Sequence, residues 1–398
     1  MKILMITPYL PYPLLSGGQI RTYNLLKNLA GKHEITLFSF IREKKEKKHI
    51  KELLKYCRNV KVIQRRKAWD WRNVFLAGLT GYPFLVSIYL SITLKKLIKK
   101  ELETNNYDLI HAETFYVMPN LPETNLPVLL VEQTIEYLVY QNFVRNFKFF
   151  PIKPLLYFDV AKIKIWEKHY WKKAARLAAM SEEDKKIIQR HLKNIKTDIV
   201  ANGVDIGYFN KAKIQKPARP TLLFVGNFKW LPNKDAARFL VEKMWPVIKK
   251  KVPNAVLWIV GKNPTENIKR LAGKDVKIDE FVKDIRNAFG KASVLVAPIR
   301  NGRGTKYKVL EAMAVGLPVV TTPLGIEGID AISGREVLTA KSAGGLTRLT
   351  IDLLLKPSLG KKIARKAKKL VDIRYNWETI SNDLDRIYKE LGKDKKSS

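Results

Sequence analysis

The sequence predicts two α/β domains in tandem, each built on a parallel β-sheet covered by helices on both faces. Three observations lead to this prediction. The chain has 398 residues, which is too long for one ordinary hydrophobic core and suits two domains. Short apolar runs alternate with helical patterns, as a parallel sheet with crossover helices requires. This alternation stops at a polar connector near the middle of the chain and then starts again.

The first half opens with the apolar run 2–6 (KILMI), which predicts a short buried strand. A glycine-containing loop leads into a helical pattern over residues 19–30, and residues 34–40 (EITLFSF) predict the next strand. Together these segments form a βαβ unit with a glycine turn at the strand-to-helix junction. Further strands are expected at residues 60–64, 109–112 and 128–132.

The second half repeats the pattern after the connector at residues 210–220, which is rich in lysine and contains two prolines. A final amphipathic helix is predicted over residues 376–391, with Trp377, Ile380, Leu384 and Ile387 on one face. Strands are expected from residue 221, at 255–260, near 276, and at 293–297 and 319–321. We therefore expect a first domain at 1–200, a linker at 201–220, a second domain at 221–372 and a closing helical segment at 373–398.

The composition narrows the function without deciding it. The formal net charge of +37 predicts an anionic partner: nucleic acid, an anionic membrane surface or a phosphorylated small molecule. Abundant lysine is also typical of proteins from hot environments, although that does not explain so few acidic residues. The single cysteine, Cys57, cannot form an intramolecular disulfide, which favours a reducing compartment, and we expect a packed or surface residue.

Two apolar segments bear on targeting. The N-terminal run ends at Pro8, and further prolines follow, so we expect no signal peptide. Residues 73–94 contain no formal charge and are long enough to span a bilayer. Because Gly78, Gly81 and Pro83 interrupt this segment, we expect no transmembrane helix there.

The most informative stretch is residues 298–322 (PIRNGRGTKYKVLEAMAVGLPVVTT). A strand ends at its first residue, a loop with Gly302 and Gly304 follows, and a helix is predicted from about Thr305 to residue 314 or 315. A glycine loop that opens onto a helix N-terminus suits an anion, because free N–H groups and the helix dipole point at the same place.

Three side chains of this helix are candidates for the same site. Lys306 and Lys308 place positive charge in the first turn, which disfavours the helix itself but is understandable if an anion binds there. Glu311 lies one to two turns further on and suits hydrogen bonds from sugar hydroxyls. The alternative is that the lysines are solvated surface charges and Glu311 an ordinary surface residue.

This stretch resembles the donor-binding signature of the retaining, family-4-type glycosyltransferases of GT-B fold. The resemblance is carried by residues 311–314 (EAMA) and 316–320 (GLPVV). The usual signature has another glutamate eight residues before Glu311, where this chain has Arg303, as in a recurrent subgroup. The resemblance implies two Rossmann-like domains facing across a cleft and a C-terminal helix that crosses back to the first domain. It also implies a hexosyltransferase that uses a nucleotide-diphosphate sugar with retention of anomeric configuration.

The resemblance extends along nearly the whole chain. Residues 202–205 (NGVD) resemble the string before the linker, and residues 224–226 (FVG) resemble the start of the donor domain. Residues 16–21 resemble the N-terminal glycine loop that faces the donor phosphates. The implied catalytic residues are Glu311, Lys306 and His111. The implied donor-binding residues are Gly17, Gly18, Gly226, Asn227, Lys229, Lys234, Gly302, Arg303, Gly304, Thr305 and Lys308.

Three residues at strand ends of the first half are candidates for the acceptor side. His111 either points into the cleft, toward the acceptor or the transferred sugar, or is a core histidine with satisfied hydrogen bonds. Glu132 and Glu136 flank the end of another strand on the same side and are candidates for acceptor contacts.

The expected mechanism is electrostatic stabilisation of the diphosphate leaving group. The expected donors are the amides of residues 302–305, Lys306 and a cation from residues 229–234, while Glu311 holds the ribose hydroxyls. We expect no metal, because no Asp-x-Asp ends a strand, and no cofactor, because the nucleotide sugar is a substrate.

The basic clusters lie mostly in the first half. Residues 61–100 hold nine Lys or Arg against one acid, and residues 138–176 hold nine against two. Aromatic residues interleave both clusters, which suits an anionic membrane surface, unless most of them are core. We therefore expect a cytoplasmic protein, peripheral on the inner face of the membrane, with a glycan or lipid-linked acceptor from polysaccharide biosynthesis. The aromatic residues are Trp69, Trp71, Phe75, Tyr82, Tyr140, Phe143, Phe147, Phe149, Phe150, Tyr157, Trp166, Tyr170 and Trp171.

Two other classes of protein compete with the transferase. A nucleic-acid-binding protein fits the charge but leaves residues 311–320 unexplained, and no recognised nucleic-acid motif is present, so no nucleic-acid partner is expected. An epimerase or an inactive scaffold on the same fold is the second alternative, because fold alone does not decide function.

Overall fold

The structure is a computed structural model that describes residues 1–215 and 217–397. Lys216 of the expected linker and Ser398 of the expected closing segment therefore lie outside the described residues. The chain divides into two compact units. Unit 1 comprises Met1–Ala201 together with the chain from Ile380 onward, and unit 2 comprises Asn202–Thr379.

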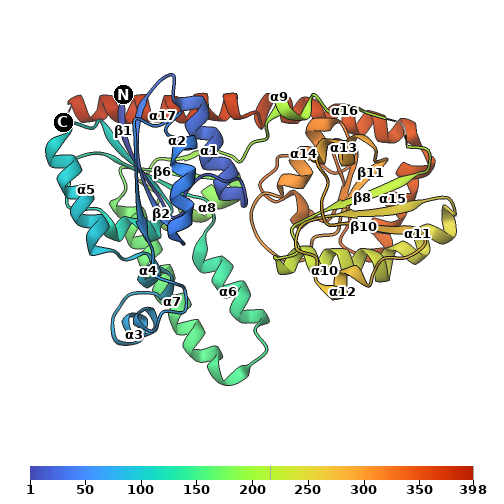
Figure 1. Ribbon diagram of the computed structural model, residues 1–398, viewed down its shortest axis with the longest axis horizontal. Coiled ribbons are helices and arrows are strands. Elements are labelled where there is room, and N and C mark those ends of the chain that lie inside the picture. Colours follow the sequence, from blue (N-terminus) through green and yellow to red (C-terminus); the bar gives the residue numbers. More distant parts are fainter. Residues whose placement is uncertain (216, 398) are drawn as a thin grey trace. The chain divides into compact units, whose positions relative to one another are not determined.

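Within the described part of unit 1, seven parallel strands form one sheet in the order β3-β2-β1-β4-β5-β6-β7 (Figure 1). The central strands are almost entirely apolar, because helices cover both faces of a parallel sheet. The strand order reverses between β1 and β4, which creates a topological switch point at their carboxyl ends. The strands are β1 (Lys2–Thr7), β2 (Glu34–Ile41), β3 (Asn59–Gln64), β4 (Leu109–Glu113), β5 (Val128–Glu132), β6 (Arg176–Ala179) and β7 (Thr197–Ile199).

The helices of unit 1 lie in the connections between strands, and α1, α3, α5 and α8 begin at polar side-chain caps. The Ser16 side chain caps α1 by accepting from the backbone amide of Gln19, and the Ser181 side chain caps α8 by accepting from the backbone amide of Asp184. The helices are α1 (Gly17–Leu29), α2 (Ile50–Leu53), α3 (Trp71–Leu79), α4 (Phe84–Tyr89), α5 (Ile92–Thr104), α6 (Glu136–Asn146), α7 (Lys153–Lys173) and α8 (Glu182–His191), with 3-10 turns η1 (Lys44–His49), η2 (Phe115–Asn120) and η3 (Phe150–Ile152).

The uncharged segment 73–94 falls into two short helices, α3 and α4, and the start of α5. The helical structure is interrupted between α3 and α4 at residues 80–83, which include Gly81 and Pro83. Among the residues that the structure describes, no helix is both long and apolar enough to cross a bilayer. Cys57 is packed inside unit 1, and burial raises the pKa of its thiol to about 12.

The described part of unit 2 contains a second parallel sheet of six strands in the order β10-β9-β8-β11-β12-β13. Its order reverses between β8 and β11. The strands are β8 (Thr221–Val225), β9 (Val256–Val260), β10 (Val276–Asp279), β11 (Val294–Ala297), β12 (Val319–Thr321) and β13 (Leu338–Thr339). The helices are α9 (Ile206–Phe209), α10 (Leu231–Phe239), α11 (Trp245–Lys251), α12 (Glu266–Lys269), α13 (Ile285–Gly290), α14 (Tyr307–Val315), α15 (Ala343–Leu355) and α16 (Pro357–Arg374), with the π-helical turn η4 (Leu240–Met244) and the 3-10 turn η5 (Pro323–Ile326).

The last helix, α17 (Trp377–Ser397), continues beyond the expected end at residue 391. Its predicted apolar face, which includes Ile380, Leu384 and Ile387, is buried. Polar contacts fix α17 on unit 1: Tyr388 Oη lies 2.5 Å from His111 Nδ1, and Asp385 Oδ1 lies 2.8 Å from His33 Nε2. The predicted fold class is confirmed, since both units are α/β with parallel sheets.

Candidate functional site

The glycine loop lies where the strand order of unit 2 reverses. Residues that follow β8 and β11 meet there, because these strands are neighbours in the sheet. Close backbone approach requires glycine at two of the strand ends. A Cβ on Gly261 would lie 1.8 Å from the carbonyl oxygen of Gly226, and a Cβ on Gly226 would lie 2.9 Å from Cγ of Asn233. These glycines therefore let the ends of β8 and β9 and the start of α10 pack closely against one another.

The loop itself is shaped by left-handed glycines and by Lys306. Gly302 has φ of 90° and Gly304 has φ of 82°, which residues with a Cβ rarely adopt. The Lys306 ammonium donates to the carbonyl oxygen of Gly302 at 3.2 Å and to that of Gly304. Burial lowers the pKa of Lys306 to about 8, an effect that the charge of Glu327 opposes. Lys306 thus holds the loop in shape.

Lys308 and Glu311 stand one turn apart on α14, just beyond the loop. Lys308 Nζ donates to Asn233 Oδ1 at 2.7 Å and lies 4.5 Å from the centre of the Phe224 ring. Burial lowers the pKa of Lys308 to about 7 and raises that of Glu311 to about 7, while each group's charge partly offsets the shift of the other. This end of α14 therefore combines an enclosed amine and an enclosed carboxyl group with a helix N-terminus.

Arg303, which stands where the usual signature has its first glutamate, pairs with a carboxylate from the next strand end. Arg303 NH2 lies 3.2 Å from Glu327 Oε1, and the Gly304 amide donates to Glu327 Oε2 at 3.1 Å. The two loops also touch through Gly328, where a Cβ would lie 2.8 Å from Thr305 Oγ1. Glu327 was not among the predicted site residues, because nothing in its local sequence indicates a contact with residues 303–305.

The string at residues 202–205 contacts the same loop. Asn202 Nδ2 donates to Thr305 Oγ1 at 3.2 Å, and Tyr307 Oη donates to Asn202 Oδ1 at 3.1 Å. Asp205 caps α9 by accepting from the Tyr208 amide at 2.8 Å. Asn202 thus supports the glycine loop through hydrogen bonds with Thr305 and Tyr307.

The remaining predicted donor-side residues of unit 2 have separate surroundings. Asn227 Oδ1 accepts from the Lys229 amide and from Asn263 Nδ2, both at 3.0 Å, so its side chain shapes a turn. The Lys229 side chain is exposed. Lys234 lies on α10 and lines a hollow of about 640 Å³ together with Asp235, Arg238 and Arg270. Of the predicted cations, the structure brings Lys306 and Lys308 to the glycine loop.

The predicted glycines of unit 1 lie at the switch point of that unit, at the start of α1. Tyr9 Oη donates to Gln133 Oε1 at 2.7 Å, and Gln133 Nε2 donates to Glu113 Oε2 at 2.7 Å. A Cβ on Gly18 would lie 2.0 Å from Tyr9 Oη, so this chain of hydrogen bonds requires glycine there. Gly17 precedes it as the first residue of α1.

His111 is fully buried at the same switch point. Its Nδ1 lies 2.5 Å from Tyr388 Oη and its Nε2 lies 3.2 Å from Glu113 Oε1. Burial alone would raise the pKa of Glu113, but the hydrogen bond and charge of His111, with the charge of Arg21, hold it below its usual value. These surroundings match the second alternative, a core histidine with both ring nitrogens partnered.

Glu132 and Glu136 belong to a cluster with Glu167, which the sequence analysis did not select. Glu132 Oε1 accepts from Trp171 Nε1 at 2.8 Å, and Glu167 accepts from the backbone amides of Glu136 and Tyr137. Burial raises the pKa of Glu132 and Glu167 well above the usual range, and the nearby acids raise both further. Burial also raises the pKa of Glu136, which is half-buried, to about 7. Within the described residues, no group of His, Cys, Asp or Glu is arranged to hold a metal ion.

Changing Glu132 to glutamine is expected to stabilise the protein at alkaline pH. The folded-state pKa is raised, so the folded protein retains a proton that the unfolded chain releases, and stability falls as pH rises toward that pKa. Glutamine keeps an acceptor for Trp171 without the charge. We expect the free energy of unfolding to rise by on the order of 1 kcal/mol near pH 8, and to change little near pH 5, in urea titrations. Glu183→Gln, on the exposed face of α8, is the control, and an equal or lower stability of Glu132→Gln at both pH values would contradict the assignment.

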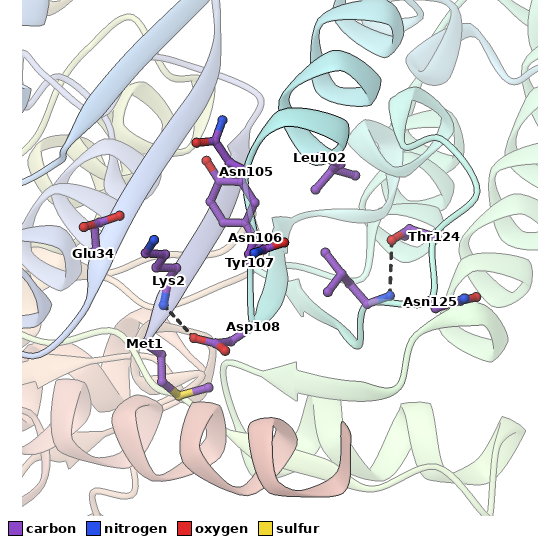
Figure 2. A pocket seen from close by; sticks show the side chains of 11 residues that line it. Met1, Lys2, Glu34, Leu102, Asn105, Asn106, Tyr107, Asp108, Thr124 and Asn125 are labelled. Atoms are coloured by element: carbon purple, nitrogen blue, oxygen red, sulfur yellow. Dashed lines mark hydrogen bonds between the residues drawn. The ribbon is translucent and has the colours of Figure 1, made fainter. Parts of the chain in front are cut away.

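A different hollow, of about 730 Å³, lies at the amino-terminal ends of the strands of unit 1, opposite the switch point (Figure 2). It is lined by residues at the amino-terminal ends of β1, β4 and β5, including Lys2, Asp108 and Leu126. Figure 2 shows the hydrogen bond from the Lys2 amide to Asp108 Oδ2, which measures 2.7 Å. The Leu126 amide donates to Thr124 Oγ1 at 3.2 Å. Ligands of open α/β sheets bind outside the carboxyl ends of the strands, so this hollow is not our candidate site.

Models of glycosyltransferase families match both halves of the chain. Residues 15–208 match the model of "Glycosyltransferase Family 4" and residues 219–355 match that of "Glycosyl transferases group 1". An uncharacterized 44.6 kDa protein from the cps region of Klebsiella pneumoniae is 23% identical over 98% of this chain and 99% of its own length. The phosphatidyl-myo-inositol mannosyltransferase of Mycolicibacterium smegmatis is 26% identical over 48% of this chain and 51% of its own length.

The fold is that of a solved glycosyltransferase from Rickettsia africae ESF-5, which superposes with a TM-score of 0.67 at 17% identity and covers 98% of each chain. The structure of Anabaena Alr3699/HepE in complex with UDP-glucose superposes with a TM-score of 0.64 at 15% identity and covers 98% of this chain and 100% of that chain. At this identity the likeness supports the fold alone, whereas the family models cover most of the sequence. On this evidence, the chain belongs to the family-4-type glycosyltransferases of GT-B fold.

Proposed function

We propose that the protein transfers a hexose from a nucleotide-diphosphate sugar to a glycan or lipid-linked acceptor, with retention of anomeric configuration and without a metal ion. The observation that carries the proposal is the grouping of the glycine loop, Lys308 and Glu311 at the start of α14. A helix N-terminus with backbone amides and an enclosed cation suits a diphosphate, and a carboxylate one turn on suits sugar hydroxyls.

In this proposal the donor's bond between the anomeric carbon and the phosphate oxygen breaks, and its electron pair stays on the diphosphate. The loop amides of residues 302–305 and the Lys308 ammonium stabilise the developing charge. Lys306 acts indirectly, because its ammonium already bonds to loop carbonyl oxygens. Glu311 accepts hydrogen bonds from the ribose hydroxyls. The acceptor hydroxyl bonds to the anomeric carbon and releases its proton.

Unit 1 is proposed to hold the acceptor, with Glu136 near it. Glu136 is half-buried, follows β5, and has a pKa raised by burial to about 7, which suits exchange of a proton near neutral pH. Glu132 is buried and accepts from Trp171 of α7, so we assign it a structural role, whereas Glu167 accepts from the amides at the start of α6. The mycobacterial relative is named for mannosyl transfer to a phosphatidylinositol, which supports a lipid acceptor. We propose that this acceptor lies at the inner face of the membrane.

The first test is a thermal-stability screen of the purified protein with UDP, GDP, ADP and their common sugar conjugates, in the presence of EDTA. We expect stabilisation by one nucleotide series, lost in Glu311→Ala. The stabilising sugar conjugate is then tested for hydrolysis and for transfer to membrane lipids. Absence of stabilisation by every nucleotide would refute the donor site, and binding without any turnover would favour a scaffold over a transferase.

Donor affinity is expected to fall as pH rises above about 7, because Lys308 has a pKa lowered to about 7 and must be protonated to hold a diphosphate. A bound diphosphate favours the ammonium form, so binding should take up a proton. The dissociation constant of the stabilising sugar conjugate should increase by up to about tenfold per pH unit in alkaline buffers, as measured by titration calorimetry. Lys308→Arg, which stays charged, should abolish this pH dependence. A pH-independent affinity in the native protein would exclude Lys308 as the titrating contact.

A further inference from the structure

Helix α3 presents its apolar side chains to solvent. Trp71, Phe75 and Leu79 lie four residues apart, on one face, and are 71%, 57% and 70% exposed. Of the nine described residues of α3, only Asn73 is buried, and its Nδ2 donates to the carbonyl oxygens of Lys67 and Ala68. Helices of globular proteins normally bury such a stripe and expose the asparagine. The pattern is therefore inverted.

A second exposed apolar group surrounds the tip between α6 and α7. Figure 1 shows these two helices as a hairpin that projects from the sheet of unit 1, with α3 beside it. Phe150, at the tip, is 76% exposed. The other exposed apolar residues of the hairpin are Phe143, Phe149, Ile152, Leu155, Tyr157, Phe158 and Ile165. Together with Trp69, Trp71, Val74, Phe75 and Leu79 of the α3 segment, these residues form what we call the apolar surface.

Hydrogen bonds fix the α3–α4 segment against α7, so the two apolar groups are held by elements that are bonded to each other. Trp166 Nε1 donates to the carbonyl oxygen of Gly81 at 2.9 Å, and Lys162 Nζ donates to those of Thr80 and Tyr82 at 3.3 Å. The Phe84 amide donates to Asp159 Oδ1 at 2.8 Å. The exposure of the apolar side chains thus results from how these elements pack.

The charge around the apolar surface is positive. The acids of this region are engaged inside the protein: Asp159 and Glu167 accept backbone amides, and Asp70 caps α3. The exposed cations beside the apolar residues are Lys67, Arg72, Arg145, Lys148, Lys164, Lys172 and Lys173. A complementary partner must therefore offer an apolar region for the aromatic side chains and negative charges around that region for the lysines and arginines.

We propose that the apolar surface inserts into the interface of an anionic phospholipid bilayer while the surrounding lysines and arginines contact the lipid headgroups. Tryptophan and phenylalanine favour the boundary between headgroups and acyl chains, and basic residues favour anionic lipids. A protein partner would need a large complementary apolar surface with acidic residues around it, whereas an anionic bilayer offers both without a specific shape. The inference deepens the proposed function by naming the membrane as a partner, but lipid binding itself does not depend on sugar transfer.

The test is flotation of the full-length protein with vesicles of phosphatidylcholine alone or mixed with phosphatidylglycerol. We expect binding to the mixed vesicles that weakens with salt, and little binding to phosphatidylcholine alone. The variants Trp71→Ser/Phe75→Ser and Phe149→Ser/Phe150→Ser should each lower the partition coefficient by at least about tenfold. Phe281→Ser/Ile373→Ser, which removes two exposed apolar side chains of unit 2, should bind as the native protein does.

Nucleotide-induced thermal stabilisation is measured on the same preparations. Variants that bind nucleotide normally but lose vesicle binding support the inference, even if the native protein turns out to have no transferase activity. Native-like vesicle binding by both surface variants would overturn it. So would a native dimer that the surface variants convert to monomers without a change in vesicle binding, because the surface would then be an interface between copies of the chain.

Discussion

Replacement of Lys308 by methionine is expected to lower kcat/KM for the nucleotide-sugar donor by about 10²–10³-fold, the usual effect of removing one charge-stabilising group from an active site. Methionine keeps an unbranched apolar side chain beside Phe224 but removes the ammonium that lies over its ring, and it leaves the helix intact. The loss should appear in kcat as well as in nucleotide affinity, because the ammonium acts on the leaving diphosphate, whose charge grows as the bond breaks. Steady-state kinetics and nucleotide titrations measure the two effects separately.

The control for this prediction is Lys250→Met, which removes an exposed lysine of α11. It should leave both parameters unchanged, and Lys308→Arg should recover part of the activity. If folded Lys308→Met binds nucleotide and turns over as the native protein does, the diphosphate is held elsewhere in the unit. Lys229 and Lys234 would then be the next residues to change.

The alternation of strands and helices and the sequence 298–322 were sufficient to predict the two domains and the glycine loop. Both depend on local patterns, because apolar runs define buried strands and glycines define the turn. The strands β6, β7 and β13 were not predicted. Their sequences, RLAA, TDI and LT, contain no run of large apolar residues, so pairing with neighbouring strands defines them.

The contacts between distant segments could not be predicted. Asn233 reaches Lys308 only because α10 begins beside the loop that follows β11, and Glu327 reaches Arg303 from the loop after β12. The sequence also could not distinguish the two lysines of α14: Lys306 folds back onto the loop, whereas Lys308 extends to Asn233. Glu167 had one weak signal, since acids are rare in residues 138–176, and both acids of that span are engaged internally.

The aromatic residues illustrate the same limit. A basic, aromatic-rich sequence is compatible with a core or with an exposed surface, and the structure divides the set. Trp171 is fully buried and donates to Glu132, whereas Trp69, Trp71 and Phe150 are exposed. Burial depends on which helix face packs against its neighbours, and in α3, which packs on α4, Asn73 is buried whereas Trp71 and Phe75 are exposed.

Replacement of Glu327 by alanine is expected to lower kcat/KM by about 10–100-fold through the shape of the glycine loop. Glu327 pairs with Arg303 and accepts from the Gly304 amide, so its loss removes two contacts that hold residues 303 and 304 beside the proposed diphosphate site. Because Glu327 acts through the loop, the effect should fall mainly on the donor KM, measured by steady-state kinetics, and Glu327→Gln should restore part of it by keeping an acceptor for Gly304.

A double-mutant cycle with Arg303→Ala separates this role from simple destabilisation. If Glu327 acts through Arg303 and the loop, the effects of the two substitutions should be strongly non-additive, since either one alone breaks the ion pair. Asp330→Asn provides the matched control, because Asp330 lies three residues further on and pairs with Arg374 at 2.9 Å, away from residues 303–305. Additive effects, or an equal loss in Asp330→Asn, would mean that the carboxylate supports only the stability of its own loop. Non-additivity would instead mean that a carboxylate after β12 keeps the proposed donor loop in place through the arginine that lies eight residues before Glu311.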